Sequence, residues 1–327
     1  MNVGSDMIGG FLGLELPEES YPLPRGHDCL YVNSGRAALE LILRSMQLRG
    51  RIFVPYYTCD SVLSICKKMG VEVVYYRIGS DLRINDPSFD MKADDLLVYT
   101  NYFGIMEDYV DELSQRWGDR LIVDNCLALY ARRRPGIPSF YSLRKFSGLA
   151  DGGIVEEAPA VKLPNDRDVS SSTATFLFQQ IELKAQEYVV ASELNEDRIA
   201  RSEPRRISRL TERMMGSVDY RKIADRRLAN FHILHEALAG LNKLTIDLSS
   251  VSVPFCYPFW TNLVEMRNEL IDSGICLPIF WENVLNEAPY DGEERKLARY
   301  LLPLPIDHRL DRSAMEYIIK CIHCCYC

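Results

Sequence analysis

The chain has 327 residues, of which 47% are hydrophobic, and its formal net charge is −8. This length is typical of about two domains, or of one large α/β domain with an appendage, and a core of that size needs neither a metal ion nor a disulfide. The acidic balance and the lack of any apolar run near the roughly eighteen residues of a membrane span predict no nucleic-acid partner and no membrane partner.

Residues 1–28 are rich in Gly, Pro and acidic residues without a clear period, which favours an irregular arm. They lack the basic region and the long apolar run of a signal peptide, so we expect a cytoplasmic protein whose ten cysteines are reduced thiols. Four cysteines crowd residues 321–327, but no second cysteine pair completes a zinc site, and the pair His232 and His235 has no third ligand nearby. We therefore predict no metal site.

A short apolar segment at residues 29–32 leads into the turn Ser34-Gly35-Arg36 and a helix at 37–46 with apolar residues at helical spacing. Strand, Ser-Gly turn and helix together form an arrangement that binds phosphate, because free backbone N–H groups and the helix dipole face the turn. Ser34 is also an ordinary helix N-cap residue. Neither of the glycine-rich motifs of dinucleotide sites and P-loops occurs, which disfavours both.

Apolar strand candidates then alternate with helices at a regular spacing. The strands are expected at 51–55, 71–76, 95–100 and 121–124, and the helices at 62–70 and 108–117. This alternation predicts an α/β fold with a mainly parallel sheet and helices on both faces. Right-handed crossovers would place Ser34, Cys59, Asn101 and Asp124 along the carboxyl edge of the sheet, where α/β proteins bind ligands.

A single lysine, Lys145, lies in the turn-rich stretch that follows Asp124. Lysine is the side chain that condenses with an aldehyde to a Schiff base, and an aspartate at the end of an earlier strand is the usual partner of the pyridinium nitrogen of pyridoxal 5'-phosphate (PLP). We therefore hypothesise that Lys145 and Asp124 hold PLP. The alternative is that Arg144-Lys145 is a solvated basic pair in a loop.

The second half of the chain has a different pattern. Residues 166–240 hold two charged, helix-like blocks, at roughly 173–192 and 207–238, and strand-like and helical pieces alternate from residue 244 onward. The predicted organisation is a large PLP-binding α/β domain at 1–165, a helical connection at 166–240 and a small C-terminal α+β domain at 241–327.

In their order and spacing, these motifs resemble those of the DegT/DnrJ/StrS family of fold-type-I PLP-dependent enzymes, best known as sugar-nucleotide aminotransferases. The resemblance runs from about residue 29 to the C-terminus. The matching segments are Ser34–Leu39 (the family's SGTAAL), Val54–Thr58 (VPSFT), Asn101–Gly104 (HLYG), Val123-Asp124 (ED), Lys145 with Gly152-Gly153, and Leu302–Ile306 (LPLH).

The resemblance implies a fold-type-I PLP-dependent transferase in which Lys145 forms the internal aldimine and Asp124 faces the ring nitrogen. It assigns the cofactor's other contacts to Ser34, Gly35, Arg36, Cys59 and Ser142. The implied substrates are an amino acid donor and a nucleotide-linked keto-sugar, for which Arg36 and the basic run Arg132–Arg134 would supply positive charge. Such enzymes build each active site at a dimer interface, so a homodimer is also implied.

Three departures from the family pattern bear on activity. Arg36 stands in the place of a threonine, Cys59 in that of the aromatic that stacks on the cofactor ring, and Leu127 in that of a polar residue near its phenolic oxygen. The last two losses together would weaken cofactor binding by roughly tenfold to thirtyfold, and Tyr57 or Tyr102 could supply a ring instead. We predict a working aminotransferase; the alternative is a catalytically degenerate PLP-fold protein acting as a binding or regulatory module.

Overall fold

The structure is a computed structural model that describes residues 14–16, 21–22, 25–26, 28–47, 49–158 and 160–326. Most of the expected N-terminal arm therefore lies outside the described residues. None of the helices in the described part of the chain is long and apolar enough to cross a membrane.

A seven-stranded sheet lies at the centre of the fold, in the order β1-β7-β6-β5-β4-β2-β3. Its strands are β1 (Leu30–Val32), β2 (Ile52–Pro55), β3 (Val73–Tyr76), β4 (Leu96–Thr100), β5 (Leu121–Asp124), β6 (Ser139–Ser142) and β7 (Gly153–Glu156). Neighbouring strands from β3 through β2, β4 and β5 to β6 run parallel, whereas β7 is antiparallel to both β6 and β1. The predicted mainly parallel α/β sheet is confirmed.

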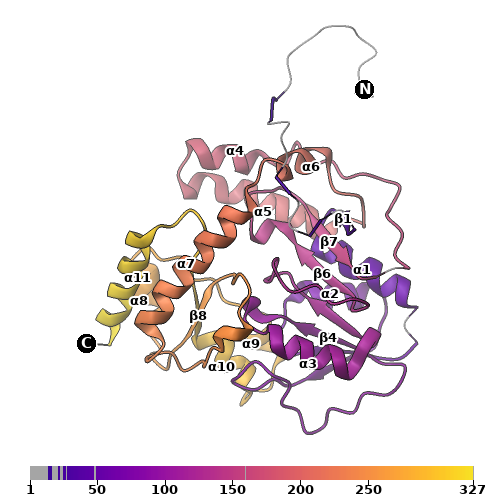
Figure 1. Ribbon diagram of the computed structural model, residues 1–327, viewed down its shortest axis with the longest axis horizontal. Coiled ribbons are helices and arrows are strands. Elements are labelled where there is room, and N and C mark those ends of the chain that lie inside the picture. The colour runs from indigo at the N-terminus through magenta and orange to yellow at the C-terminus, as the bar shows by residue number, and fades with distance from the viewer. Residues whose placement is uncertain are drawn as a thin grey trace, which may run out of the picture.

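Both faces of the sheet are buried, because successive strand residues point to opposite sides. In β4, Val98 packs toward helices α1 (Gly35–Met46) and α2 (Asp60–Lys68), whereas Tyr99 packs on the other face, which α3 (Glu107–Trp117) covers together with the C-terminal part of the chain. Figure 1 shows these layers, with α3 in front of the sheet.

The C-terminal part is built on a two-stranded antiparallel sheet of β8 (Tyr257–Trp260) and β9 (Leu301–Leu304). Figure 1 shows α7, α8 and α11 grouped beside it, and α4, α5 and α6 at the top. The helices after β7 are α4 (Thr175–Glu182), α5 (Ala185–Arg201), α6 (Arg209–Met215), α7 (Tyr220–Leu238), α8 (Met266–Asp272), α9 (Val284–Glu287), α10 (Glu293–Tyr300) and α11 (Arg312–Cys325). One apolar cluster continues from the large sheet into this part, and the domain boundaries near 165 and 240 stay predictions.

The two long helix-like blocks of the sequence are each divided into two helices. The block expected at 207–238 breaks after Gly216, and α7 begins anew at Asp219, whose side chain accepts a hydrogen bond from the Lys222 N–H. Asp is a strong N-cap residue, so a helix start at this point competes with a continuous helix. The block at 173–192 divides at Leu183, whose backbone is extended.

Candidate active site

An open cavity with an empty volume of about 740 Å³ lies where β4 and β5 end and α1 begins. Every residue that the sequence predicted for the cofactor site lines it, although these residues come from distant parts of the chain: Ser34, Gly35, Arg36, Cys59, Asp124, Ser142 and Lys145. Asn101, expected at the same edge, does not line this cavity. Its amide instead donates hydrogen bonds to Glu107 Oε1 (2.7 Å) and Asn125 Oδ1 (2.9 Å).

One end of the cavity is formed by the N-terminus of α1. Ser34 is the N-cap of this helix, because its Oγ accepts a hydrogen bond from the Ala37 N–H at 3.0 Å. The first N–H groups of a helix have no partners within it, so they remain available to an anion. A Cβ added to Gly153 of β7 would lie 2.2 Å from the Ser34 carbonyl oxygen, so only glycine lets β7 approach this turn so closely.

Arg144 adds a second cation beside Arg36 at this end of the cavity, a role that the sequence did not reveal. Burial, and then the charge of Arg36, lower the pKa of Arg144 to about 10. Glu196 of α5 forms an ion pair with Arg144, but the buried Nε of Arg144 has no hydrogen-bond partner among the described residues. Two neighbouring guanidinium groups next to a helix N-terminus are an environment suited to a phosphate group.

Asp124, the last residue of β5, is a buried carboxylate at the base of the cavity. Its Oδ1 accepts a hydrogen bond from the Cys126 N–H at 2.9 Å. Burial raises the pKa of Asp124, while the hydrogen bonds from Cys126 and the charge of Lys145 act in the opposite direction. A cation placed against this carboxylate would therefore favour its charged form.

Lys145 ends a 3₁₀ turn, Leu143–Lys145, that follows β6 directly. Its side chain is open to the cavity, and it makes no hydrogen bond or ion pair with any other described residue. The protein around the cavity nevertheless desolvates the ammonium, which lowers the pKa of Lys145; Arg144 and Arg36 lower it further, and the Cys59 and Cys126 thiols oppose them. A lysine with a lowered pKa is a better nucleophile near neutral pH.

The expected replacement for the stacking ring is wrong. Tyr57 and Tyr102 are fully buried in the core, with ring centroids 5.4 Å apart, and neither lines the cavity. The aromatic residues that do line it are Phe140 of β6 and Trp281, and Trp281 packs edge-on against Tyr57 with ring centroids 5.1 Å apart. Both tyrosines belong to the apolar cluster on the face of the sheet that α3 and the C-terminal part cover, which their positions in the motifs did not reveal.

The residues of the cavity fit PLP. The positive end formed by α1, Arg36 and Arg144 matches a phosphate, and Asp124 matches a protonated ring nitrogen. Lys145 supplies an amine without a partner, and the buried Thr100 Oγ1, opposite Asp124 in the sheet, also lacks one among the described residues. These unsatisfied polar groups face one cavity, as expected for a site that holds a polar, anionic cofactor.

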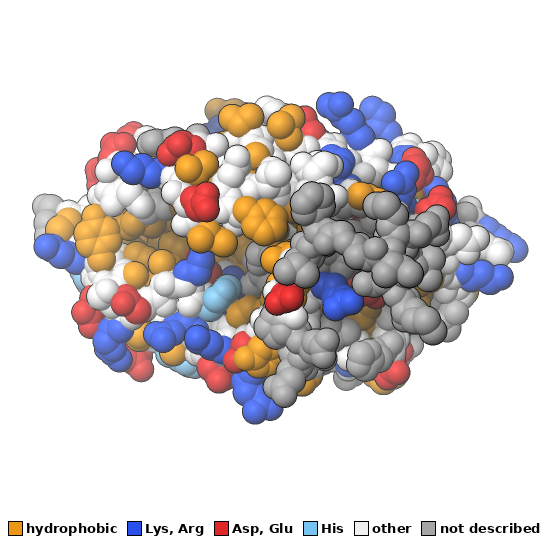
Figure 2. Space-filling model, turned by 90° about the horizontal axis from the view of Figure 1, so that it is seen from above, with side chains coloured by type: hydrophobic (Ala, Val, Ile, Leu, Met, Phe, Trp, Pro, Cys, Tyr) orange, Lys and Arg blue, Asp and Glu red, His pale blue; other side chains and the backbone are white. Residues whose placement is uncertain are grey.

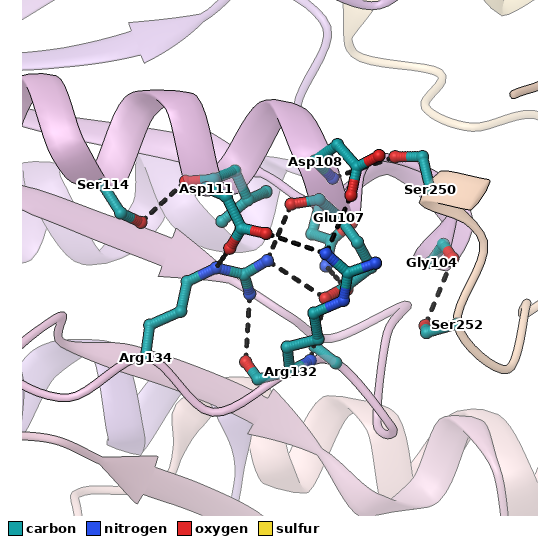
Figure 3. Close-up of polar contacts among 12 residues, drawn as sticks. Gly104, Glu107, Asp108, Asp111, Ser114, Arg132, Arg134, Ser250 and Ser252 are labelled. Carbon is teal, nitrogen blue, oxygen red and sulfur yellow. Dashed lines mark hydrogen bonds and ion pairs between the residues drawn. The ribbon is translucent and has the colours of Figure 1, made fainter.

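The basic run Arg132–Arg134 is not a patch for an anionic substrate, which corrects the sequence-based expectation. Figure 3 shows Arg132 and Arg134 turned toward the acidic residues of α3. Arg134 donates to Asp111 (2.6 Å) and to the buried Glu107 (3.0 Å), and Arg132 donates to Asp108 and Asp111, each at 2.8 Å. Arg133 donates to Glu157 at 2.6 Å. All three charges are therefore compensated within the chain.

Replacing Arg134 with methionine should lower the free energy of unfolding by about 3 kcal/mol, because it leaves Glu107 buried without its ionic partner. The matched control is Arg132→Met, which removes a half-exposed arginine from the same cluster and should cost less than about 1 kcal/mol. Urea unfolding of both variants measures the difference, provided that the unfolding free energy depends on urea concentration with the same slope in each. Equal losses of stability in the two variants would show that the buried ion pair of Arg134 with Glu107 contributes no more than an exposed one.

Among the described residues there is no group of three or more His, Cys, Asp or Glu side chains that could hold a metal ion. Each cysteine in this part of the chain is a free thiol. Cys327, the last member of the C-terminal cysteine cluster, lies outside the described residues.

No family model and no curated protein matches this chain. It is similar in structure to DesV from S. venezuelae, solved with a ketimine intermediate, at 22% identity and a TM-score of 0.62 over 90% of this chain and 83% of that one. A DegT/DnrJ/EryC1/StrS aminotransferase from Brucella abortus is 14% identical in sequence, with a TM-score of 0.58 over 90% of this chain and 85% of that one. Spr1654 from Streptococcus pneumoniae is assigned as a sugar aminotransferase and was solved in its PLP form. It is 16% identical in sequence, with a TM-score of 0.60 over 91% of this chain and 86% of that one.

This likeness extends over most of both chains. The chain has the fold of the fold-type-I PLP-dependent transferases. Within that class, its fold is the one seen in aminotransferases of the DegT/DnrJ/EryC1/StrS type.

Proposed function

We propose that this chain is a PLP-dependent aminotransferase that moves an amino group from an amino acid to a keto-sugar, with a nucleotide-linked sugar as the expected acceptor. The observation that carries the proposal is the meeting of Lys145, the buried Asp124 and the cationic turn Ser34–Arg36 in one cavity. Support for the cofactor and for the sugar comes from Spr1654, whose structure holds the PLP form and which is assigned to sugars.

Each residue then has a defined task. Ser34, Gly35, Arg36 and Ser142 bind the cofactor phosphate, with Arg144 as an addition to the predicted set. The Asp124 carboxylate keeps a proton on the ring nitrogen. The bound cofactor supplies an electron sink for the substrate carbon. The Nζ of Lys145 holds the cofactor aldehyde at rest and, once released, carries a proton to and from the substrate carbon as general acid and base.

Cys59 and Trp281 border the region where the cofactor ring would lie. Cys59 is too small to stack on a ring. Two aromatic residues line the cavity: Phe140, which is buried in β6, and Trp281, which is only partly buried. We assign Trp281 to covering the ring and excluding water, and Cys59 to packing against it. The homodimer and the cytoplasmic location stay predictions, and light scattering at micromolar concentration that gives a monomer would contradict the first.

The proposal is tested by a half-reaction. Purified protein loaded with PLP should absorb visible light, and adding L-glutamate or another amino donor should replace that absorbance with the near-ultraviolet band of the aminated cofactor. A wide panel of donors separates catalysis from the alternative of a degenerate binding or regulatory module. If protein that demonstrably holds PLP on Lys145 responds to none of them, the aminotransferase proposal is wrong.

A further inference from the structure

Two acidic side chains of the described chain line the cofactor cavity, and only Asp124 has a task in the proposed function. The other is Glu196 of α5, whose carboxylate forms an ion pair with Arg144. Figure 2 shows acidic and basic side chains interspersed over the upper face of the molecule, where solvent reaches them. The Glu196 side chain is also 52% exposed, yet it shares its cation with the end of the cavity that suits a phosphate. A carboxylate at that position needs an explanation.

The position of Glu196 is fixed by the residues on both sides of it in α5. The buried Asn195 donates a hydrogen bond from Nδ2 to the Ala150 carbonyl oxygen at 2.7 Å, which ties the helix to the loop after the lysine. Arg198 donates to both carboxylate oxygens of the buried Asp168, at 3.0 and 2.8 Å. The Glu196 carboxylate is therefore placed at the cavity by the packing of α5 and not by a loop.

The electrostatics of this end of the cavity explain what the carboxylate does there. Burial, and then the charge of the neighbouring Arg36, lower the pKa of Arg144. Arg36 itself makes no hydrogen bond or ion pair with any other described residue. Two guanidinium groups held close together are unfavourable without an anion between or beside them. Glu196 supplies one negative charge at this point, which is the electrostatic role that a bound phosphate would also fill.

We propose that Glu196 and the cofactor phosphate compete for Arg144, so that Glu196 keeps other anions out of the cofactor site. The inference rests on the proposed function, which assigns this end of the cavity to a phosphate. Any anion must displace the carboxylate from Arg144, which lowers the affinity of each anion for the site. PLP overcomes this competition because Lys145 binds its aldehyde as well, whereas inorganic phosphate has no second attachment.

The test is a calorimetric titration of PLP-free protein with inorganic phosphate. Glu196→Gln removes the charge and keeps the shape of the side chain, so phosphate should bind roughly threefold to tenfold more tightly than to the wild type. The matched control is Glu193→Gln, which removes an exposed carboxylate one turn earlier on α5, outside the cavity, and should leave the dissociation constant unchanged. The phosphate concentration that halves the rate of PLP uptake should fall by the same factor in Glu196→Gln.

Weaker phosphate binding in Glu196→Gln would overturn the proposal, because it would show that the carboxylate only holds Arg144 in position. Equal affinity in Glu196→Gln and the wild type would overturn it as well. If phosphate binding responds as expected but the wild type never attaches PLP to Lys145, the proposed aminotransferase function is wrong and the competition at Arg144 stands. Attached PLP together with an unchanged phosphate affinity would refute the competition alone.

Discussion

Replacing Lys145 with alanine is expected to abolish covalent attachment of PLP and to lower aminotransferase turnover by about 10⁴-fold. In the proposed function, one Nζ both holds the cofactor and moves the proton at the substrate carbon, and no other described lysine lines the cavity. The measurement is reduction with borohydride followed by peptide mass spectrometry, which should find the cofactor on the peptide that contains Lys145. Turnover is measured separately with saturating donor.

The control for this substitution is Lys162→Ala, which removes an exposed lysine outside the cavity. That variant should keep both the modified peptide and full turnover. Borohydride labelling of Lys145→Ala to the same extent as the wild type would show that another amine holds the cofactor, and the assignment of the site would then be wrong.

Asp124→Asn is expected to lower turnover by about 10³-fold while PLP stays bound, because an amide cannot stabilise a protonated ring nitrogen as a carboxylate does. The same change should stabilise the cofactor-free protein by about 1 kcal/mol at neutral pH, since it removes a buried charge and keeps the acceptor for the Cys126 N–H. Activity and stability would then change in opposite directions at a single position.

The pH dependence of this stability difference follows from the raised pKa of Asp124. Below the pKa of the unfolded chain, about 4, the carboxyl is neutral in both states and the folded protein bears no charge penalty. As the pH rises through the folded-state pKa, the wild type loses stability, whereas the Asn variant does not titrate there. Thermal unfolding of both proteins should therefore show a difference in Tm, with the Asn variant higher, that grows from acid to neutral pH.

Asp119→Asn, at an exposed position just before β5, is the matched control and should change neither property. Equal losses of cofactor binding and turnover in Asp124→Asn would show that Asp124 only supports the fold. A variant that is less stable than the wild type at neutral pH would show that Lys145 compensates the carboxylate fully.

The sequence was most informative where one residue type could serve only one purpose. The apolar segments of β2, β4 and β5 are bounded by turns and buried on both faces, so their composition alone indicates a parallel sheet. Lys145 and Asp124 could be selected because few side chains can hold an aldehyde or a pyridinium nitrogen.

Charge partners could not be predicted, because pairing depends on which elements meet in space. Arg134 and Arg144 both occur in basic runs, yet one is paired with α3 and the other lies beside Arg36 at the cavity. Trp281 reaches the cavity only because the C-terminal part packs against the large sheet. No local pattern around this residue marks that contact.

The antiparallel pairing of β1 with β7, in which Val32 lies opposite Gly153, has a consequence for synthesis of the chain. The turn after Val32 and strand β7, which follows Lys145 in the chain, together complete the end of the cavity at α1. The cavity is therefore incomplete until Gly153 has emerged from the ribosome. Synthesis adds roughly 5–20 residues per second, so the strands and helices made before Gly153 exist for several seconds before this part of the cavity can form. If the chain binds PLP as proposed, the cofactor stabilises only chains in which this pairing has formed, so it acts on the finished α/β domain and gives no help to the nascent one.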